Sequence, residues 1–432
     1  MKDILPEQAW RWQRLEQEFR RVVELRGFGE VRTPLIEPTE LFVREIGADT
    51  DVVEKEMYSF DRHGDALTVR PEGTAGAARA YVQHSVHAAE PVTRWYYLGA
   101  MFRAERPAKG RYRQFFQAGC EHFGDSGPVC DAEMIHMTAE IVERLGIKDY
   151  AIHLSSLGSA DTRTRYRSAL REHFGPRAAE LSDDSRRRLD SNPLRILDSK
   201  APQDAEAIAG APSILDLLVG DDADHFSRLR SLLDRLGVRY VVDPKLVRGL
   251  DYYTRTLFEL KATTGELGAQ SALLGGGRYD GMVESLGGPR VPAIGFAMGI
   301  ERLLEVMPEG VAPGGPEAYL APMGPAAQLE ALALAQHLRG EGLRCEVDGR
   351  GLKLRAMLRR ADGVGARFCL LLGDDELARG AVTLKDLGRH EQLELPLSEV
   401  ARVLGERRQL PRSNDAPGGT GGAGSEASGP DA

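Results

Sequence analysis

Residues 98–124, LGAMFRAERPAKGRYRQFFQAGCEHFG, contain two strand-like stretches on either side of a turn-rich basic segment. Alternate side chains of a strand share one face of a sheet. One face of the first stretch therefore carries Met101, Arg103 and Glu105. The matching face of the second stretch carries Phe115, Gln117, Gly119, Glu121 and Phe123, and the connecting segment adds Arg106, Lys109, Arg111 and Arg113.

A sheet face that offers arginine, carboxylates, an amide and an aromatic ring is not an ordinary apolar core. Buried charges need partners, and arginines in a connecting loop suit a polyphosphate. The set therefore predicts a site for a polar, phosphate-bearing ligand. A solvated hairpin with surface ion pairs explains any one of these residues equally well, but it explains the whole set much less well.

Four more segments combine glycines with charged or aromatic residues: RPEGT at 70–74, RGLDYY at 248–253, GGGRYDG at 275–281 and GFAMGIER at 295–302. Taken alone, each has a structural explanation, such as a turn or tyrosines packed on a sheet edge. The segment 275–281 matches neither a P-loop nor a dinucleotide fingerprint. In the last segment, small residues permit a close strand-to-helix passage that leaves Arg302 in the first helical turns.

The composition is that of an ordinary globular chain. Of 432 residues, 42% are hydrophobic and 28% charged, and 56 basic against 65 acidic side chains give a net charge of −9. This balance argues against indiscriminate nucleic-acid binding but allows local basic surfaces. The four cysteines show neither zinc-ligand spacing nor a disulfide framework. Without a membrane-spanning run or a secretory pattern, a cytoplasmic protein with no membrane partner is expected.

Changes of pattern along the chain divide it into parts. A helix-favouring polar stretch over 163–236 interrupts the strand and glycine patterns, so 1–162 and 237–310 are predicted to form one discontinuous core with a helical insertion. A linker rich in proline and glycine separates this core from 317–405, where strands alternate with helices as in a small α/β domain. Residues 406–432 are too poor in apolar side chains to fold and are predicted to be a disordered tail.

Together these segments resemble the histidyl-tRNA synthetases of bacterial type, in the class II aminoacyl-tRNA synthetase superfamily. Segment 27–46 is similar to motif 1, the dimerising element, 98–124 to motif 2 and 291–307 to motif 3. LVRGLDYYTRTLFE at 246–259 and ALLGGGRYDGM at 272–282 resemble histidine-specific signatures. The resemblance implies an α+β fold: a six- or seven-stranded antiparallel sheet flanked by helices, a helical insertion and a C-terminal α/β anticodon-binding domain.

The resemblance also implies an activity and its partners. A protein of this family is a histidine-tRNA ligase, which activates L-histidine with ATP to histidyl-adenylate. It then transfers the histidyl group to the 3′ end of histidine tRNA. The resemblance further implies a homodimer, with Mg²⁺ bridging the phosphates of ATP. The protein ligands of the metal stay open.

The site residues that the resemblance implies fall into three groups. ATP would meet Arg103, Glu105, Arg111, Phe115 and Arg302. Histidine would meet Glu72, Thr74, Gln117, Glu121, Tyr252, Tyr253 and Tyr279. The catalytic groups would be Arg248, Arg103 and Arg302. Fixed cations suit this reaction because adenylation brings two anions together, and no set of residues typical of a protein nucleophile stands out.

Two other interpretations stay open at this point. A regulatory paralogue from histidine biosynthesis would resemble the core, but such proteins usually lack the C-terminal domain and lose signature residues that are present here. A class II synthetase for threonine, proline or glycine is opposed by the two histidine-specific segments. Three positions depart from the family pattern. Ala104 and Phe116 stand where many relatives carry histidine, and both lie on the alternate strand face, where a change is expected to be tolerated. Ala108 stands where a glutamine often helps to read the acceptor end of the tRNA, so the mode of that recognition stays open.

Overall fold

The computed structural model describes residues 3–47, 50–264 and 271–408. The chain divides into two compact units, Met1–Gly310 and Val311–Ala432. Most of the predicted tail, 409–432, lies outside the described residues. Within the described ranges, no helix is both long enough and apolar enough to cross a membrane.

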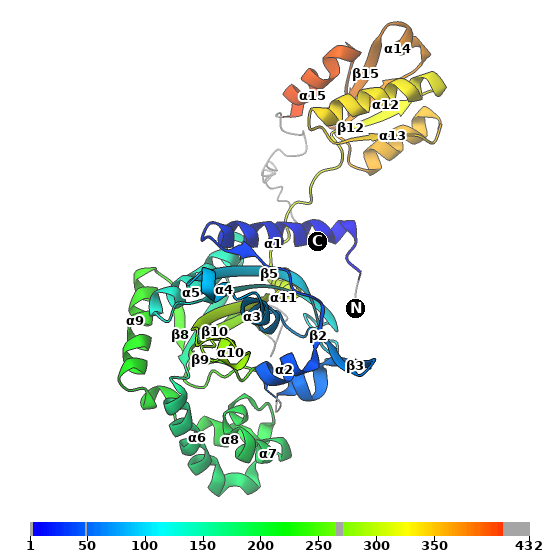
Figure 1. Cartoon of the computed structure of the whole chain (residues 1–432). Helices are drawn as coiled ribbons and strands as arrows, with labels where there is room; N and C mark the ends of the chain where they lie inside the picture. The colour runs from blue at the N-terminus through cyan, green and yellow to red at the C-terminus, as the bar shows by residue number, and fades with distance from the viewer. Residues whose placement is uncertain (1–2, 48–49, 265–270, 409–432) are drawn as a thin grey trace, which may run out of the picture. The chain divides into compact units, whose positions relative to one another are not determined.

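An eight-stranded sheet forms the centre of the first unit (Figure 1). Its six inner strands are antiparallel, in the order β5-β6-β11-β10-β9-β7, and a short parallel strand is added at each edge, β1 beside β5 and β8 beside β7. The antiparallel sheet is confirmed with six strands, and the two parallel edge strands bring the total to eight, above the six or seven that the resemblance implies. Strands β1 and β8 have only two and three residues, too few to give an alternation of their own. The strands are β1 (Gly29–Glu30), β5 (Thr93–Phe102), β6 (Gln114–Phe123), β7 (Tyr150–Ser156), β8 (Tyr240–Val242), β9 (Thr254–Ala262), β10 (Ala272–Arg278) and β11 (Ala293–Gly299).

Three long helices cover one face of this sheet. Ala118 and Cys120 of β6 lie in an apolar core together with residues of α1, α5 and α9. The first of them, α1, supplies its buried side chains at helical spacing. The residues of β6 between these core positions face the opposite side, which leaves that face free for polar chemistry. The bounds are α1 (Pro6–Glu24), α5 (Pro128–Arg144) and α9 (Asp221–Arg235).

Smaller elements cover part of the second face. Tyr81 of α3 stacks on Phe123 of β6 with ring centroids 4.4 Å apart, and residues of α10 join the same cluster. A separate three-stranded sheet, in the order β2-β4-β3, precedes α3 in the chain. The short elements of this unit outside the helical stretch are β2 (Ile36–Pro38), α2 (Thr39–Ile46), a π-helical turn (Val52–Glu56), β3 (Tyr58–Arg62), β4 (Asp65–Val69), α3 (Thr74–Gln83), α4 (Val86–Ala89), α10 (Met282–Ser285) and α11 (Ile300–Val306). Of these, α11 contributes Ile300 and Leu303 to the main core on the first face.

Residues 163–236, which were predicted to be helical, consist of helices and 3₁₀ turns. The helices that precede α9 form a separate core around Tyr166 and Phe174. Tyr253 and Leu257, which follow the helical stretch in the chain, join that core. The last helix of the stretch, α9, packs against α5 and contributes Phe226 to the main core. The helical stretch is therefore tied to the sheet at two places. Its other helices are α6 (Ala160–Phe174), α7 (Asp183–Ser191) and α8 (Ala205–Ala209), with 3₁₀ turns at Gly175–Glu180, Pro193–Asp198, Pro202–Asp204 and Ile214–Leu217.

The second unit is a five-stranded sheet with helices, in the order β13-β12-β14-β15-β16. Strands β12, β13 and β14 are parallel, as alternating strands and helices predict, and β14, β15 and β16 are antiparallel. Two elements were not predicted: α14, which lies between β14 and β15, and β16, which forms a hairpin with β15 before the last helix. The elements are β12 (Ala318–Pro322), α12 (Pro325–Gly340), β13 (Cys345–Val347), α13 (Leu354–Gly363), β14 (Phe368–Leu372), α14 (Asp374–Ala378), β15 (Ala381–Asp386), β16 (Glu391–Pro396), a 3₁₀ turn (Leu397–Glu399) and α15 (Val400–Arg408).

Candidate active site

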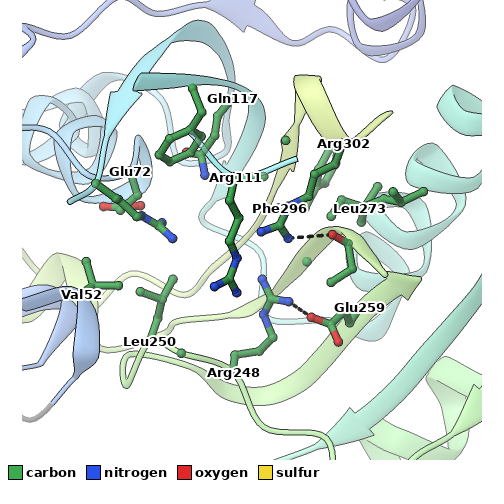
Figure 2. Close-up of a pocket in the computed structure, with 18 of the residues that line it drawn as sticks. Val52, Glu72, Arg111, Gln117, Arg248, Leu250, Glu259, Leu273, Phe296 and Arg302 are labelled. Atoms are coloured by element: carbon green, nitrogen blue, oxygen red, sulfur yellow. Dashed lines mark hydrogen bonds and ion pairs between the residues drawn. The ribbon is translucent and has the colours of Figure 1, made fainter. Parts of the chain in front are cut away.

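A cavity of about 420 Å³ lies on the face of the large sheet opposite the three long helices (Figure 2). Strands β6, β9, β10 and β11 and the loop between β5 and β6 contribute to its walls. The residues singled out from the sequence that line it are Glu72, Thr74, Arg103, Glu105, Arg111, Phe115, Gln117, Arg248, Tyr252, Tyr253, Tyr279 and Arg302. Glu121 is fully buried next to this lining, where it accepts hydrogen bonds from Thr74 and Tyr279.

Arg103 is held by the backbone and by an aromatic ring. Its Nε donates to the carbonyl oxygen of Pro71 at 2.9 Å, and its guanidinium carbon lies 5.3 Å from the centroid of the Phe115 ring. Strand β5 ends at Phe102, one residue before Arg103, so the expected strand alternation stops short of Arg103 and Glu105. The backbone N–H of Arg103 still donates to the carbonyl of Arg113 at 2.9 Å, which continues the pairing of the two strands.

Three further guanidinium groups converge from distant parts of the chain. Figure 2 shows Arg111, Arg248 and Arg302 pointing toward the same space. Arg302, at the start of α11, donates to the carbonyls of Gly110 at 3.1 Å and Ala272 at 2.9 Å. Burial, and then the nearby charge of Arg111, lower the pKa of Arg302. An anion between these cations would remove that repulsion, so the arrangement favours a phosphate or carboxylate ligand.

The guanidinium of Arg248 lies against Gly275 and pairs with the carboxylate of Glu259. Its Nη1 forms an ion pair with Oε1 of Glu259, drawn as a dashed line in Figure 2. The other oxygen of Glu259 lies 3.1 Å from Nζ of Lys261. Burial alone would raise the pKa of Glu259, but the charges of Arg248 and Lys261 hold it below its usual value. Glu259 is thus an ionised carboxylate, and the sequence analysis gave it no role.

Glu121 is a buried carboxyl surrounded by hydroxyl groups. Its Oε1 accepts from Oγ1 of Thr74 at 2.8 Å and from the Tyr97 hydroxyl at 3.2 Å, and its Oε2 accepts from the Tyr279 hydroxyl at 2.5 Å. Burial raises the pKa of Glu121 to about 8, more than these hydrogen bonds lower it. Below that pH the carboxyl carries a proton, so it can donate an O–H to an acceptor atom of a polar ligand while its own geometry stays fixed.

Tyr97 was not singled out from the sequence, although it holds Glu121. A Cβ atom on Gly73 or Gly119 would come within 2.2 or 2.4 Å of its ring, so the tyrosine depends on glycine at both positions. Those two glycines are the sequence feature that could have indicated the role of Tyr97. They could not be used in advance, because Tyr97 and Glu121 are 24 positions apart and the sequence between them does not indicate which tyrosine reaches the carboxyl.

Some polar atoms at the cavity have no hydrogen-bond partner within the described part of the chain. They include Oε1 of Gln117 and the Nε atoms of Arg111 and Arg248. In contrast, both oxygens of Glu72 are in use, since they accept the backbone N–H groups of Thr74 at 2.7 Å and Ala75 at 2.8 Å. Buried polar atoms are normally paired. The unpaired acceptor and donors therefore indicate a ligand that supplies both kinds of partner.

Aromatic rings form another part of the cavity. The ring centroids of Tyr252 and Tyr253 are 4.6 Å apart, and those of Tyr252 and Tyr279 are 5.7 Å apart. Nη1 of Arg163, on the first helix of the helical stretch, donates to the carbonyl of Tyr253 at 3.0 Å. Among the described residues, no group of three or more histidine, cysteine or carboxylate side chains could hold a metal ion.

The cavity therefore combines a cluster of cations with a small pocket of tyrosines and carboxyls. On an antiparallel sheet flanked by helices, this is the architecture of class II aminoacyl-tRNA synthetases, to which the sequence motifs also point. A family model described as histidyl-tRNA synthetase matches residues 1–303, and one described as anticodon binding domain matches residues 317–407.

Comparison with individual proteins agrees with this class. The chain is 63% identical to a histidine--tRNA ligase of Sorangium cellulosum over 94% of this chain and 95% of that one. It is 50% identical to a histidine--tRNA ligase of Halorhodospira halophila over 93% and 96% of the two chains. The crystal structure of apo S. aureus histidyl-tRNA synthetase matches with a TM-score of 0.79 and 34% identity, covering 94% of this chain and 98% of that one. The chain belongs to the histidyl-tRNA synthetase family.

Proposed function

We propose that this chain ligates histidine to tRNA in two steps at the described cavity, with ATP as the second substrate. The family and the similarity to histidine--tRNA ligases over nearly the whole chain support this activity. The observation that carries the assignment of the site is the convergence of Arg111, Arg248 and Arg302 beside a pocket of tyrosines and carboxyls. The regulatory-paralogue interpretation is disfavoured because the second unit matches the anticodon-binding family.

In the first step, a carboxylate oxygen of histidine attacks the α-phosphorus of ATP, and diphosphate leaves. Both reactants are anions, and negative charge accumulates on the α-phosphate oxygens. We assign Arg248, Arg103 and Arg302 to stabilise that charge, with Arg111 and Glu105 completing the nucleotide site and Phe115 stacking under the adenine. Guanidinium groups fixed before reaction stabilise the charge without reorganisation.

We assign histidine to the tyrosine and carboxyl pocket. Its ammonium group would meet Glu72, Thr74 and Gln117, and the free Oε1 of Gln117 is an acceptor suited to it. Its imidazole would meet Glu121 and Tyr253, with Tyr252 and Tyr279 lining the pocket. A pocket that bonds both ring nitrogens rejects analogues that cannot pair, because its own polar groups would be left unsatisfied.

Mg²⁺ is the metal that this reaction implies. It usually keeps several water ligands and needs only one or two carboxylates when phosphates bind it. Glu301 accepts the backbone N–H of Phe116 at 3.0 Å, and Glu259 is paired with Arg248. Glu105 would hold the metal through its Oε1, which lies 3.9 Å from Arg103, while its Oε2 lies 3.1 Å from Nη1 of Arg111. When bound, Mg²⁺ would neutralise charge on the phosphates of ATP.

We propose that the second unit binds the anticodon stem-loop of histidine tRNA, as its domain family suggests. We also retain the predicted division into a discontinuous core (1–162 and 237–310), a helical insertion (163–236) and the domain at 317–405. The packing of α9 on the main core indicates that the insertion's separate core ends before that helix. A cytoplasmic location fits the family and is likewise a proposal.

We propose a homodimer formed through the region of motif 1. The three-stranded sheet of this region exposes large apolar side chains: Leu35, Ile36, Tyr58 and Phe60 are 36% to 49% accessible. Apolar groups of this size gathered on one small sheet suit a second copy of the chain better than water. A sedimentation mass of one chain at micromolar concentration, with full activity, would contradict this proposal.

Arg248→Ala tests the assignment of the site. Removing a preorganised donor at a developing charge costs about 10²–10³ in rate. Single-turnover formation of histidyl-adenylate should slow by about that factor, and Arg248→Lys should recover only part because lysine lacks the planar fork. Transfer from preformed adenylate to tRNA should suffer less, since the attacking hydroxyl is neutral. A variant with the wild-type melting temperature and an adenylation rate within twofold of wild type would refute the assignment.

A further inference from the structure

Arg248 owes its position to two residues on adjacent strands that no part of the function above uses. Glu259 on β9 and Gly275 on β10 are directly paired in the antiparallel register. Side chains of directly opposed residues stand on the same face of a sheet. Glu259 therefore stands on the cavity face beside the position where Gly275 has no side chain.

The missing side chain makes room for the guanidinium. A Cβ atom on Gly275 would lie 2.2 Å from Cζ of Arg248 and 2.3 and 2.4 Å from its two Nη atoms. These distances are far below van der Waals contact. Arg248 can reach Glu259 only because residue 275 is glycine.

The positive charges around Arg248 explain why its guanidinium needs a negatively charged partner to hold it in place. Arg103, Arg111 and Arg248 all contribute to the lowered pKa of Arg302, which places four cations within electrostatic reach of one another. Repulsion would push a mobile arginine out of such a cluster. Glu259 supplies the opposing charge, and its side chain is only 13% exposed, so water screens the pair weakly.

The pairing with Glu259 also leaves N–H donors of Arg248 available for a ligand. Glu259 occupies Nη1 of Arg248, and the Nε of that arginine has no hydrogen-bond partner within the described residues. Lys261, two positions along the same strand, holds the other oxygen of Glu259 at 3.1 Å. The carboxylate is thereby fixed from both sides.

We propose that Glu259 and Gly275 form a cradle that orients the Arg248 guanidinium toward the α-phosphate before substrates bind. Glu259 is a positioning residue that acts through Arg248, and Gly275 sets the clearance. The proposal rests on the proposed function, because it takes Arg248 as the cation that acts on the α-phosphate.

A double-mutant cycle tests the cradle. The rate of histidyl-adenylate formation is measured in single turnovers at saturating substrates for wild type, Glu259→Gln, Arg248→Ala and the double variant. A displacement of about 1 Å can cost about 10² in rate. Glu259→Gln should therefore slow adenylation at least 10-fold in the wild-type background and less than twofold when Arg248 is already alanine. The KM for histidine should change less than twofold, since Glu259 does not contact the tyrosine and carboxyl pocket.

Gly275→Ala provides a second variant in case Glu259→Gln lowers the melting temperature. It should slow the wild-type enzyme by a similar factor but leave Arg248→Ala unaffected, because that variant vacates the space above residue 275. Glu394→Gln is the matched control, since it removes a carboxylate from an exposed arginine pair in the second unit and should leave the rate unchanged.

The outcomes separate the two proposals. If Arg248→Ala reacts within twofold of wild type, the assignment of Arg248 fails and the cradle fails with it. If Arg248→Ala is slow but Glu259→Gln and Gly275→Ala stay within twofold of wild type, the cradle alone is overturned. If Glu259→Gln and Gly275→Ala slowed adenylation equally in the wild-type and the Arg248→Ala backgrounds, the cradle would also be overturned, because the two residues would then act independently of Arg248.

Discussion

Glu121→Gln should remove a pH dependence of folding that burial of this carboxyl creates. Glutamine keeps the shape of the side chain, and its amide oxygen can still accept from Thr74 and Tyr97, while its amide N–H would donate to the Tyr279 hydroxyl; it cannot take up a proton in this range. The comparison with wild type therefore isolates the titration of one group, while other buried carboxyls contribute equally to both proteins.

The sign and size of the effect follow from the pKa of Glu121. Burial raises this pKa from the ordinary value of 4.5 to about 8. Between those two pH values, the folded chain holds a proton that the unfolded chain has lost. The free energy of unfolding therefore decreases as pH rises, by about 1.4 kcal/mol per pH unit for one proton. Over the whole interval the loss comes to about 5 kcal/mol.

The assay is urea denaturation at pH 5, 6, 7 and 8, at one protein concentration, for wild type and Glu121→Gln. The stability of the variant relative to wild type should increase steadily with pH and level off above about pH 8. A difference between the two proteins that stays constant from pH 5 to pH 8 would refute the reasoning. It would mean that Glu121 ionises at its ordinary pKa despite its burial.

Three further predictions concern packing and domain roles. Asp131→Ala should lower the free energy of unfolding by about 3–5 kcal/mol in urea denaturation, because it removes the carboxylate 2.6 Å from the fully buried Arg278 and leaves it with the longer contact to Asp280 at 3.3 Å; a loss below 1 kcal/mol would contradict this. Gly119→Ala should push the Tyr97 ring away from Glu121 and lower the free energy of unfolding by about 1–3 kcal/mol. It should also raise the KM for histidine but not the KM for ATP. The control Gly340→Ala, which has open space around residue 340, should change neither the stability nor the KM for histidine. Deleting 317–432 should leave adenylation measurable but weaken charging of tRNA, and unchanged charging would refute the role of the second unit.

The sequence could predict those elements whose pattern is local. The two strand-like stretches of 98–124 were predicted because their alternation is complete within each stretch. Strands β1 and β8 could not be delimited from the sequence, because two or three residues define no period. The hairpin ending in β16 was missed although Gln392 and Glu394 alternate with Leu393 and Leu395 there, because that strand lies at the sheet edge, where the apolar face is only half-buried.

The site was predictable as a set of residues but not as a geometry. Strand alternation placed Gln117 and Glu121 on one face, and the resemblance to the family supplied the remaining residues. The contact from Tyr279 to Glu121 joins residues 158 positions apart, and no local pattern encodes such a distance. The pairing of Arg248 with Glu259 escaped for a different reason: both lie in one signature, but only the register of β9 against β10 shows that Gly275 leaves room for the contact.

The most direct test of the central claim is histidine-dependent exchange between ATP and labelled diphosphate. Each of the twenty amino acids is offered separately to the purified full-length chain. The account predicts exchange with histidine alone, and its loss by a factor of about 10²–10³ in Arg248→Ala. Exchange with another amino acid would contradict the assignment of the tyrosine and carboxyl pocket. No exchange with any of the twenty would contradict the ligase activity itself.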